Sequence, residues 1–74
     1  LFTVYPNPAH ETVYIETGII FDELALFDSK GQCISTLKTN NTHYGYNVSQ
    51  LSNGVYLLVG RKGNTYYSYK LIKN

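Results

Sequence analysis

The chain has a single cysteine, Cys33, and it lacks tryptophan and methionine altogether. One cysteine excludes an internal disulfide, so either the protein resides in a reducing compartment or the fold is stable without the cross-links typical of small secreted domains. No apolar run approaches the ~20 residues of a membrane-spanning helix. The net charge of +1 gives no electrostatic reason to expect a nucleic-acid partner.

What the chain does contain fits one small domain made of strands. Its 74 residues include eight tyrosines and three phenylalanines. A chain of this size buries roughly 60% of its unfolded surface, which gives a thin core. Tyrosine suits such a core because its ring is apolar and its hydroxyl can remain in water. No signal peptide is evident, and residues 1–5 read as a strand, so we expect the chain to be a piece of a longer protein.

Short runs of β-branched and aromatic residues recur at roughly ten-residue spacing, without helical periodicity. These runs lie at residues 2–5, 12–16, 23–27, 32–38, 44–48, 55–59 and 65–72. Turn residues at 28–31 and 61–64 predict two hairpins. The pattern predicts an all-β, immunoglobulin-like antiparallel sandwich of about seven short strands, without the Cys-Trp-Cys core of antibody domains.

Alternation along the runs predicts which side chains enter the core. Val13 and Ile15 share one face of their strand, and Leu24 and Leu26 share one face of theirs. The run at 55–59 is apolar throughout, which predicts a central strand covered on both sides.

Candidate catalytic and metal-binding residues are few. Cys33 with His10 or His43 could be a nucleophile and a base, but we expect Cys33 to be a small core residue within a strand. Both histidines are predicted in loops without a carboxylate to orient them. The pairs at 10–11 and 22–23 project to opposite faces, and no zinc or calcium spacing is present. We therefore predict no catalytic residue, no metal site and no cofactor.

The tyrosines allow two interpretations. Tyr44 and Tyr46 share one face of a strand, as do Tyr67 and Tyr69. Such pairs could stack on sugars, which would make the chain a carbohydrate-binding module of a secreted enzyme, or they could pack across the sandwich. We favour packing, and we expect Tyr66 to be the exposed aromatic residue. The lack of tryptophan weakens the carbohydrate hypothesis.

A tyrosine near the start of a late strand can hydrogen-bond back to the preceding turn. Tyr56 follows the turn at 49–53, and Gly54 permits a tight entry into the strand. We therefore expect Tyr56 to fasten this turn.

Three motifs together resemble the C-terminal sorting domain, type A, of the type IX secretion system. They are Val-Tyr-Pro-Asn-Pro-Ala at 4–9, Asn-Gly-Val-Tyr-Leu-Leu at 53–58 and Lys-Leu-Ile-Lys at 70–73. The Asp-x-x-Gly hairpin at 28–31 also fits this family. The resemblance covers essentially the whole chain, residues 1–74, and implies a sorting domain cut from a larger secreted precursor.

The resemblance implies a cargo tag with no activity of its own. Such a tag directs an upstream cargo through the outer membrane of a Gram-negative bacterium, passing through the periplasm to the cell surface or the medium. The partners implied are the outer-membrane secretion machinery and a sortase-like protease, which cleaves the cargo for release or surface attachment. A structural spacer would be a third, weaker reading.

Residue by residue, the motifs single out two sets. The family motif falls on Pro6, Asn7, Pro8, Gly54 and Tyr56, and recognition by the translocon is expected at Lys70, Ile72, Lys73 and Asn74. The two prolines remove backbone donors, which places their segment at a sheet edge or outside the sheet.

The last strand raises a geometric question. Alternation puts Lys70 beside Ile72 on one face and Lys73 on the other. A receptor could therefore grip one face, or it could capture the edge by strand addition. An exposed first or last strand could also pair weakly with a second copy.

Overall fold

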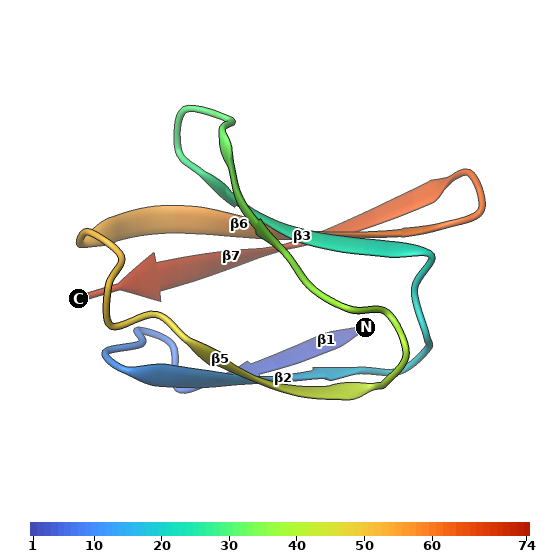
Figure 1. Ribbon diagram of the computed structural model, residues 1–74, viewed down its shortest axis with the longest axis horizontal. Coiled ribbons are helices and arrows are strands. Elements are labelled where there is room, and N and C mark those ends of the chain that lie inside the picture. Colours follow the sequence, from blue (N-terminus) through green and yellow to red (C-terminus); the bar gives the residue numbers. More distant parts are fainter.

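The computed structural model describes residues 1–74 as a sandwich of two antiparallel sheets (Figure 1). The strands are β1 (Phe2–Tyr5), β2 (Thr12–Thr17), β3 (Glu23–Asp28), β4 (Cys33–Thr36), β5 (His43–Asn47), β6 (Gly54–Lys62) and β7 (Thr65–Lys73). One sheet has the order β1-β2-β5 and the other β4-β3-β6-β7. The predicted seven-stranded all-β sandwich is confirmed. No helix is long and apolar enough to cross a membrane.

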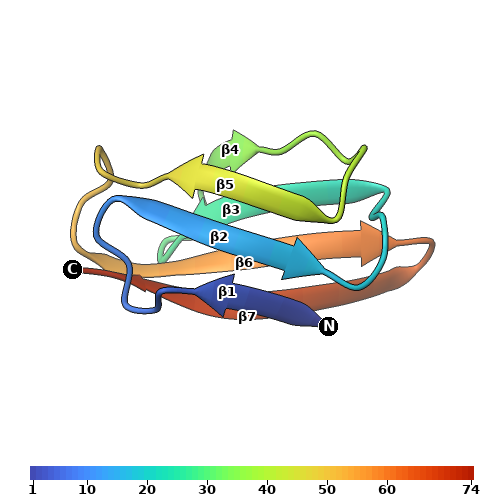
Figure 2. The same ribbon diagram turned by 90° about the horizontal axis from the view of Figure 1, so that it is seen from below.

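The two sheets lie face to face, and consecutive strands often change sheet. Figure 2 shows β1 and β7 along one side of the sandwich and β4 and β5 along the other. Both β1 and β7 are edge strands of their sheets. This arrangement brings the two ends of the sequence to the same side of the molecule.

The core forms from alternate positions of both sheets. Val13, Ile15, Leu24 and Leu26 are all buried, as predicted. The remaining buried apolar residues are Val4, Ala9, Phe21, Val48, Tyr56, Leu58 and Leu71. Burial of these side chains is the main term that stabilises the fold, since no disulfide is present.

The prediction that β6 is covered on both sides is wrong. Tyr56 and Leu58 are buried, but Val55 and Leu57 remain 43% and 40% exposed. β6 lies between β3 and β7 within its sheet, and the second sheet packs on the inner face only, so the outer face is open apart from the β3–β4 hairpin that rises above it. The apolar run therefore forms a strand with one buried face and one apolar face that is exposed to solvent.

A close contact between a ring and a backbone closes one end of the core. The ring of Phe21 is buried and lies against Gly60 of β6, where an added Cβ would come within 2.8 Å of it. Phe2 stacks on Phe21 with ring centroids 5.3 Å apart. Gly60 thus leaves the space that this aromatic pair occupies.

The hairpin predicted at 28–31 is confirmed. Oδ1 of Asp28 accepts hydrogen bonds from the backbone N–H groups of Lys30 and Gln32, each at 2.9 Å. Gly31 has a φ of 83°, which glycine adopts without steric cost. The second hairpin turn is narrower than expected, because β6 continues to Lys62. β4 is shorter than predicted and follows a register shift between Leu26 and Phe27.

Candidate functional site

The end of β7 is held by the segment between β1 and β2. The side chain of Asn7 lies alongside β7, where Nδ2 donates to the carbonyl of Lys70 at 3.1 Å. Oδ1 of the same side chain accepts the backbone N–H of Ile72 at 2.9 Å. One asparagine thus satisfies two backbone groups on the free edge of the last strand.

Two further residues extend this contact. The backbone N–H of Ala9 donates to the carbonyl of Ile72 at 2.7 Å, and the N–H of Asn74 donates to the carbonyl of Ala9 at 3.0 Å. Ala9 is fully buried and forms a parallel bridge with Lys73. Nδ1 of His10 lies 3.2 Å from the carbonyl oxygen of Asn74. We call residues 7–10 the clasp.

The clasp determines whether a strand of another protein can pair with the edge of β7. The prolines lie outside the strands, as predicted: Pro6 comes directly before the clasp and Pro8 lies within it. Capture of residues 70–74 by strand addition does not fit this structure, because the clasp already bonds to the carbonyls of Lys70 and Ile72 and the N–H groups of Ile72 and Asn74. Sequence reasoning placed the proline segment at a sheet edge or outside the sheet, but it did not identify β7 as the edge that this segment contacts.

The four closing residues differ in exposure. Lys70 and Asn74 are exposed, and Ile72 is partly buried. Lys73 is only 7% exposed, and its Nζ donates to the carbonyl of Asn74 at 3.4 Å. Lys70 and Ile72 share the outer face of the sheet, while Lys73 shares the inner face with Leu71, as alternation predicted. The side chain of Lys73 is therefore much less accessible to a receptor than the side chain of Lys70.

The middle motif lies on the other side of β7. Gly54 pairs with Lys73, and Val55 pairs with Ile72. The hydroxyl of Tyr56 donates to the carbonyl of Ser52 at 2.6 Å, so the predicted bond to the preceding turn is confirmed. All three motifs are thus neighbours in space, with β7 between the clasp and the start of β6.

The charged groups gather at the opposite end of the four-stranded sheet. Nε of Arg61 donates to Oε1 of Glu23 at 2.9 Å, and this bond raises the pKa of Arg61. The backbone N–H of Gly63 donates to Asp22 at 2.7 Å and holds the pKa of that carboxyl below its ordinary value, with help from the nearby charges of Lys62 and Arg61. Lys70 takes part in no ion pair.

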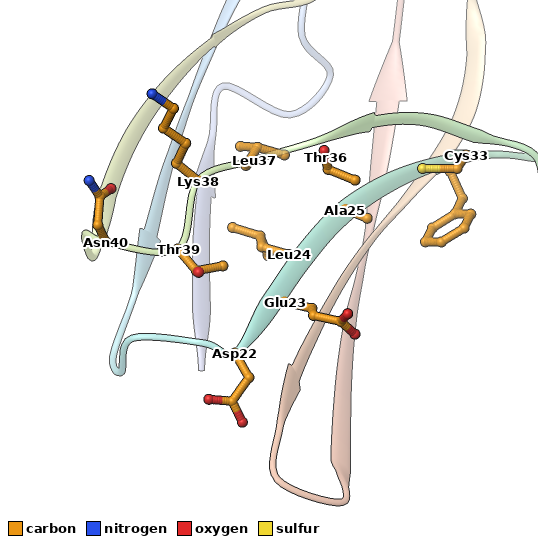
Figure 3. A pocket seen from close by; sticks show the side chains of 11 residues that line it. Asp22, Glu23, Leu24, Ala25, Cys33, Thr36, Leu37, Lys38, Thr39 and Asn40 are labelled. Carbon is orange, nitrogen blue, oxygen red and sulfur yellow. The ribbon is translucent and has the colours of Figure 1, made fainter.

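The predictions for Cys33 and His43 are wrong in part. Cys33 is exposed, because the register shift after Leu26 leaves it at an uncovered sheet edge beside an open hollow (Figure 3). His43 lies in β5, not in a loop, and its Nε2 is 3.6 Å from Oε1 of Glu16. The thiol of Cys33 donates its one hydrogen bond to the carbonyl of Ser35 at 3.8 Å, so no cysteine–histidine pair forms.

The hollow in Figure 3 lies between β3 and the segment that follows β4. Its lining combines apolar side chains such as Leu24 and Leu37 with Asp22 and Lys38. No group of three histidine, cysteine, aspartate or glutamate residues is placed to hold a metal ion anywhere in the molecule.

The tyrosines follow the packing interpretation. The four predicted core-facing rings belong to Tyr44, Tyr46, Tyr67 and Tyr69, and all of them pack partly buried against the core. Tyr66 is 67% exposed, as predicted. Sequence reasoning missed a second exposed pair, Tyr5 and Tyr14, whose ring centroids are 5.7 Å apart because the two residues pair across β1 and β2.

Comparison with family models identifies a match for this chain. The family model described as "Secretion system C-terminal sorting domain" matches residues 3–74, which is nearly the whole chain. No curated protein matches the chain.

Proposed function

The chain belongs to the family of secretion system C-terminal sorting domains, and on that premise we propose that the folded end of β7 is what the export machinery reads. The function of the domain is that of a sorting signal for type IX secretion. A sorting domain is not itself catalytic, and it implies a secretion machinery that recognises it and an upstream cargo that it accompanies.

We call Lys70, Ile72 and Asn74 the address, meaning the residues that a receptor of the export machinery contacts. Lys73 holds the end of the strand in position. Lys70 and Asn74 are exposed, and Ile72 lies partly exposed beside Lys70. Lys73 lies beneath them, and its backbone bridges to Ala9. A receptor would contact the exposed three directly, while Lys73 would keep the end of the strand in place.

The observation that carries this proposal is the clasp. Asn7 bonds to Lys70 and Ile72 only when residues more than sixty positions apart have come together. An address built in this way exists in the folded domain and is lost in the unfolded chain. We therefore propose that the machinery tests folding at the same time as it reads the signal. Transit through the periplasm and removal of the tag by a sortase-like protease complete the proposed sequence of events.

A fusion experiment tests the function. A reporter with an export leader is joined to residues 1–74 and produced in a bacterium that has type IX secretion. We expect the reporter at the cell surface or in the medium, and in the periplasm when the chain is absent or the secretion machinery is deleted. Equal delivery with and without the chain would refute the proposal.

A further inference from the structure

The outer face of the β4-β3-β6-β7 sheet is apolar around Lys70. In the register of this sheet, Leu57 lies between Lys70 of β7 and Phe27 of β3. The row on one side pairs Val55 with Ile72, and the row on the other places Val59 between Ala25 and the polar residue Ser68. Cross-strand neighbours on one face are in contact, so these side chains form a continuous surface. We call Phe27, Val55, Leu57, Val59, Lys70 and Ile72 the outer patch.

The patch is hollowed as well as apolar. The β3–β4 hairpin rises above this face of the sheet (Figure 1), and Ser29 and Gly31 of the hairpin line a shallow hollow with Val55, Leu57 and Val59. The outer face of the other sheet is different, since it presents polar residues such as Glu16 and His43 beside its tyrosines. An uncovered apolar face on only one sheet is typical of an interaction surface.

The charges of the patch indicate what kind of surface fits it. Lys70 is its only charged side chain and has no ion pair. Asp28 borders the hollow, but its Oδ1 already accepts two backbone N–H groups of the hairpin. The six residues of the outer patch include no carboxylate, so a second copy that met it patch to patch would place another Lys70 there and no acidic partner. A partner that buries the ammonium group of Lys70 must supply an anionic group, because a buried cation without a partner is costly.

We propose that the outer patch is the docking surface for a protein of the secretion machinery whose matching face is apolar and carries an aspartate or glutamate opposite Lys70. The proposal rests on the sorting function and extends the address beyond β7. Lys70 and Ile72 then form one border of a larger contact, and Leu57 lies at its centre with Val55 beside it. This arrangement explains why two large apolar side chains at the middle of the sheet remain exposed.

The test uses the reporter fusion with the Val55→Thr/Leu57→Gln double variant, which removes apolar contacts without emptying the core. The matched control is Tyr66→Gln, an exposed aromatic residue on the same face but outside the patch. We expect the double variant to lower delivery about tenfold or more, as central contact residues do, while the control delivers like the unaltered chain. The melting temperature of each purified variant shows whether it remains folded.

Charge and partner identity are tested separately. Lys70→Glu should lower delivery more than Lys70→Met, which keeps an apolar side chain of similar length. If the double variant is unfolded, the comparison of Lys70→Glu with Lys70→Met tests the docking surface in its place. A photo-reactive residue in place of Leu57 should cross-link to an outer-membrane protein during export, whereas one in place of Tyr14, on the other sheet, should not.

The outcomes separate the two proposals. Normal delivery by the folded double variant, or equal delivery by the two Lys70 variants, overturns the docking surface and leaves the sorting function intact. Cross-links between two copies, or binding of the purified chain to anionic phospholipid vesicles through Leu57, overturn the choice of partner. Failure of the unaltered chain to direct export overturns the sorting function itself.

Discussion

Asn7 and Ile72 lie 65 residues apart in the sequence, and Oδ1 of Asn7 accepts the backbone N–H of Ile72 at 2.9 Å. The same side chain donates to the carbonyl of Lys70. A residue of the opening motif therefore fixes the position of the closing motif. This contact joins the Pro-Asn-Pro segment to the backbone of the strand that carries the two closing lysines.

Replacing Asn7 by alanine should loosen the end of β7. Two side-chain hydrogen bonds are lost, and water replaces them only in part, so we expect the free energy of unfolding to fall by about 1 kcal/mol. Hydrogen exchange at the amide of Ile72 should accelerate. Asn64→Ala, in the second hairpin turn, is the control and should leave both measurements unchanged. An unchanged exchange rate at Ile72 in the Asn7 variant would show that the clasp does not hold the strand.

Replacing Tyr56 by phenylalanine should destabilise the Ser49–Asn53 turn. The variant keeps the buried ring but loses the 2.6 Å hydrogen bond from the hydroxyl to the carbonyl of Ser52. We expect a loss of about 1 kcal/mol, measured as a lower urea midpoint. Tyr66→Phe, at an exposed ring without a hydrogen bond, should not move the midpoint. Equal midpoints for the two variants would count against a stabilising hydrogen bond between Tyr56 and the turn.

Replacing Gly60 by alanine should disturb the aromatic end of the core. The new Cβ would meet three atoms of the Phe21 ring at 2.8 to 2.9 Å, so the ring or the strand must move. Overpacking of this kind costs roughly 1 to 3 kcal/mol. Gly45→Ala is the control, because its Cβ would meet Tyr14 at an ordinary 3.7 Å. A Gly60 variant with an unchanged melting temperature would disprove this account of the contact.

Stability should fall in acid partly through Asp22. Its pKa in the folded chain is lowered, first by the hydrogen bond from Gly63, so its ionised form favours the folded state. This contribution is fully present above the ordinary pKa of an aspartate and is lost as the pH falls through the lower folded value. Melting temperatures between pH 7 and pH 3 should therefore drop less for Asp22→Asn than for the unaltered chain. Parallel curves for the two proteins would rule out this contribution.

Much of the fold was predictable from the sequence because the governing signals are local. Alternation placed Val13 and Leu24 in the core, and Asp28 and Gly31 have the chemistry of the hairpin that they form. Local patterns cannot show which element covers a strand, so the apolar run around Leu57 was wrongly expected to be buried on both sides. The register shift that leaves Cys33 exposed arises from pairing between β3 and β4 and has no signature in the run itself.

The candidate site was predictable only in part. The motifs named Asn7, Gly54 and Lys70, and alternation correctly separated the faces of Lys70 and Lys73. The contact between Asn7 and β7 could not be predicted, because nothing local links residues so far apart. Alternation placed Lys73 on the inner face, but it did not predict the bridge from Ala9 of the clasp to this residue.

The two lysines of the last strand separate recognition from stability. Lys70 is exposed and unpaired, so Lys70→Ala should leave the melting temperature unchanged and impair delivery. Lys73 is buried, so Lys73→Ala should lower the melting temperature through lost packing of its methylene groups. Equal effects of the two substitutions on stability would contradict the different positions of these side chains.

The most direct measurement is the surface delivery of a reporter that carries the Lys70→Ala chain, made together with the melting temperature of the same purified variant. We predict a clear loss of delivery from a domain that melts at the same temperature as the unaltered one. Full delivery by that folded variant would contradict the claim that the machinery reads the exposed end of β7.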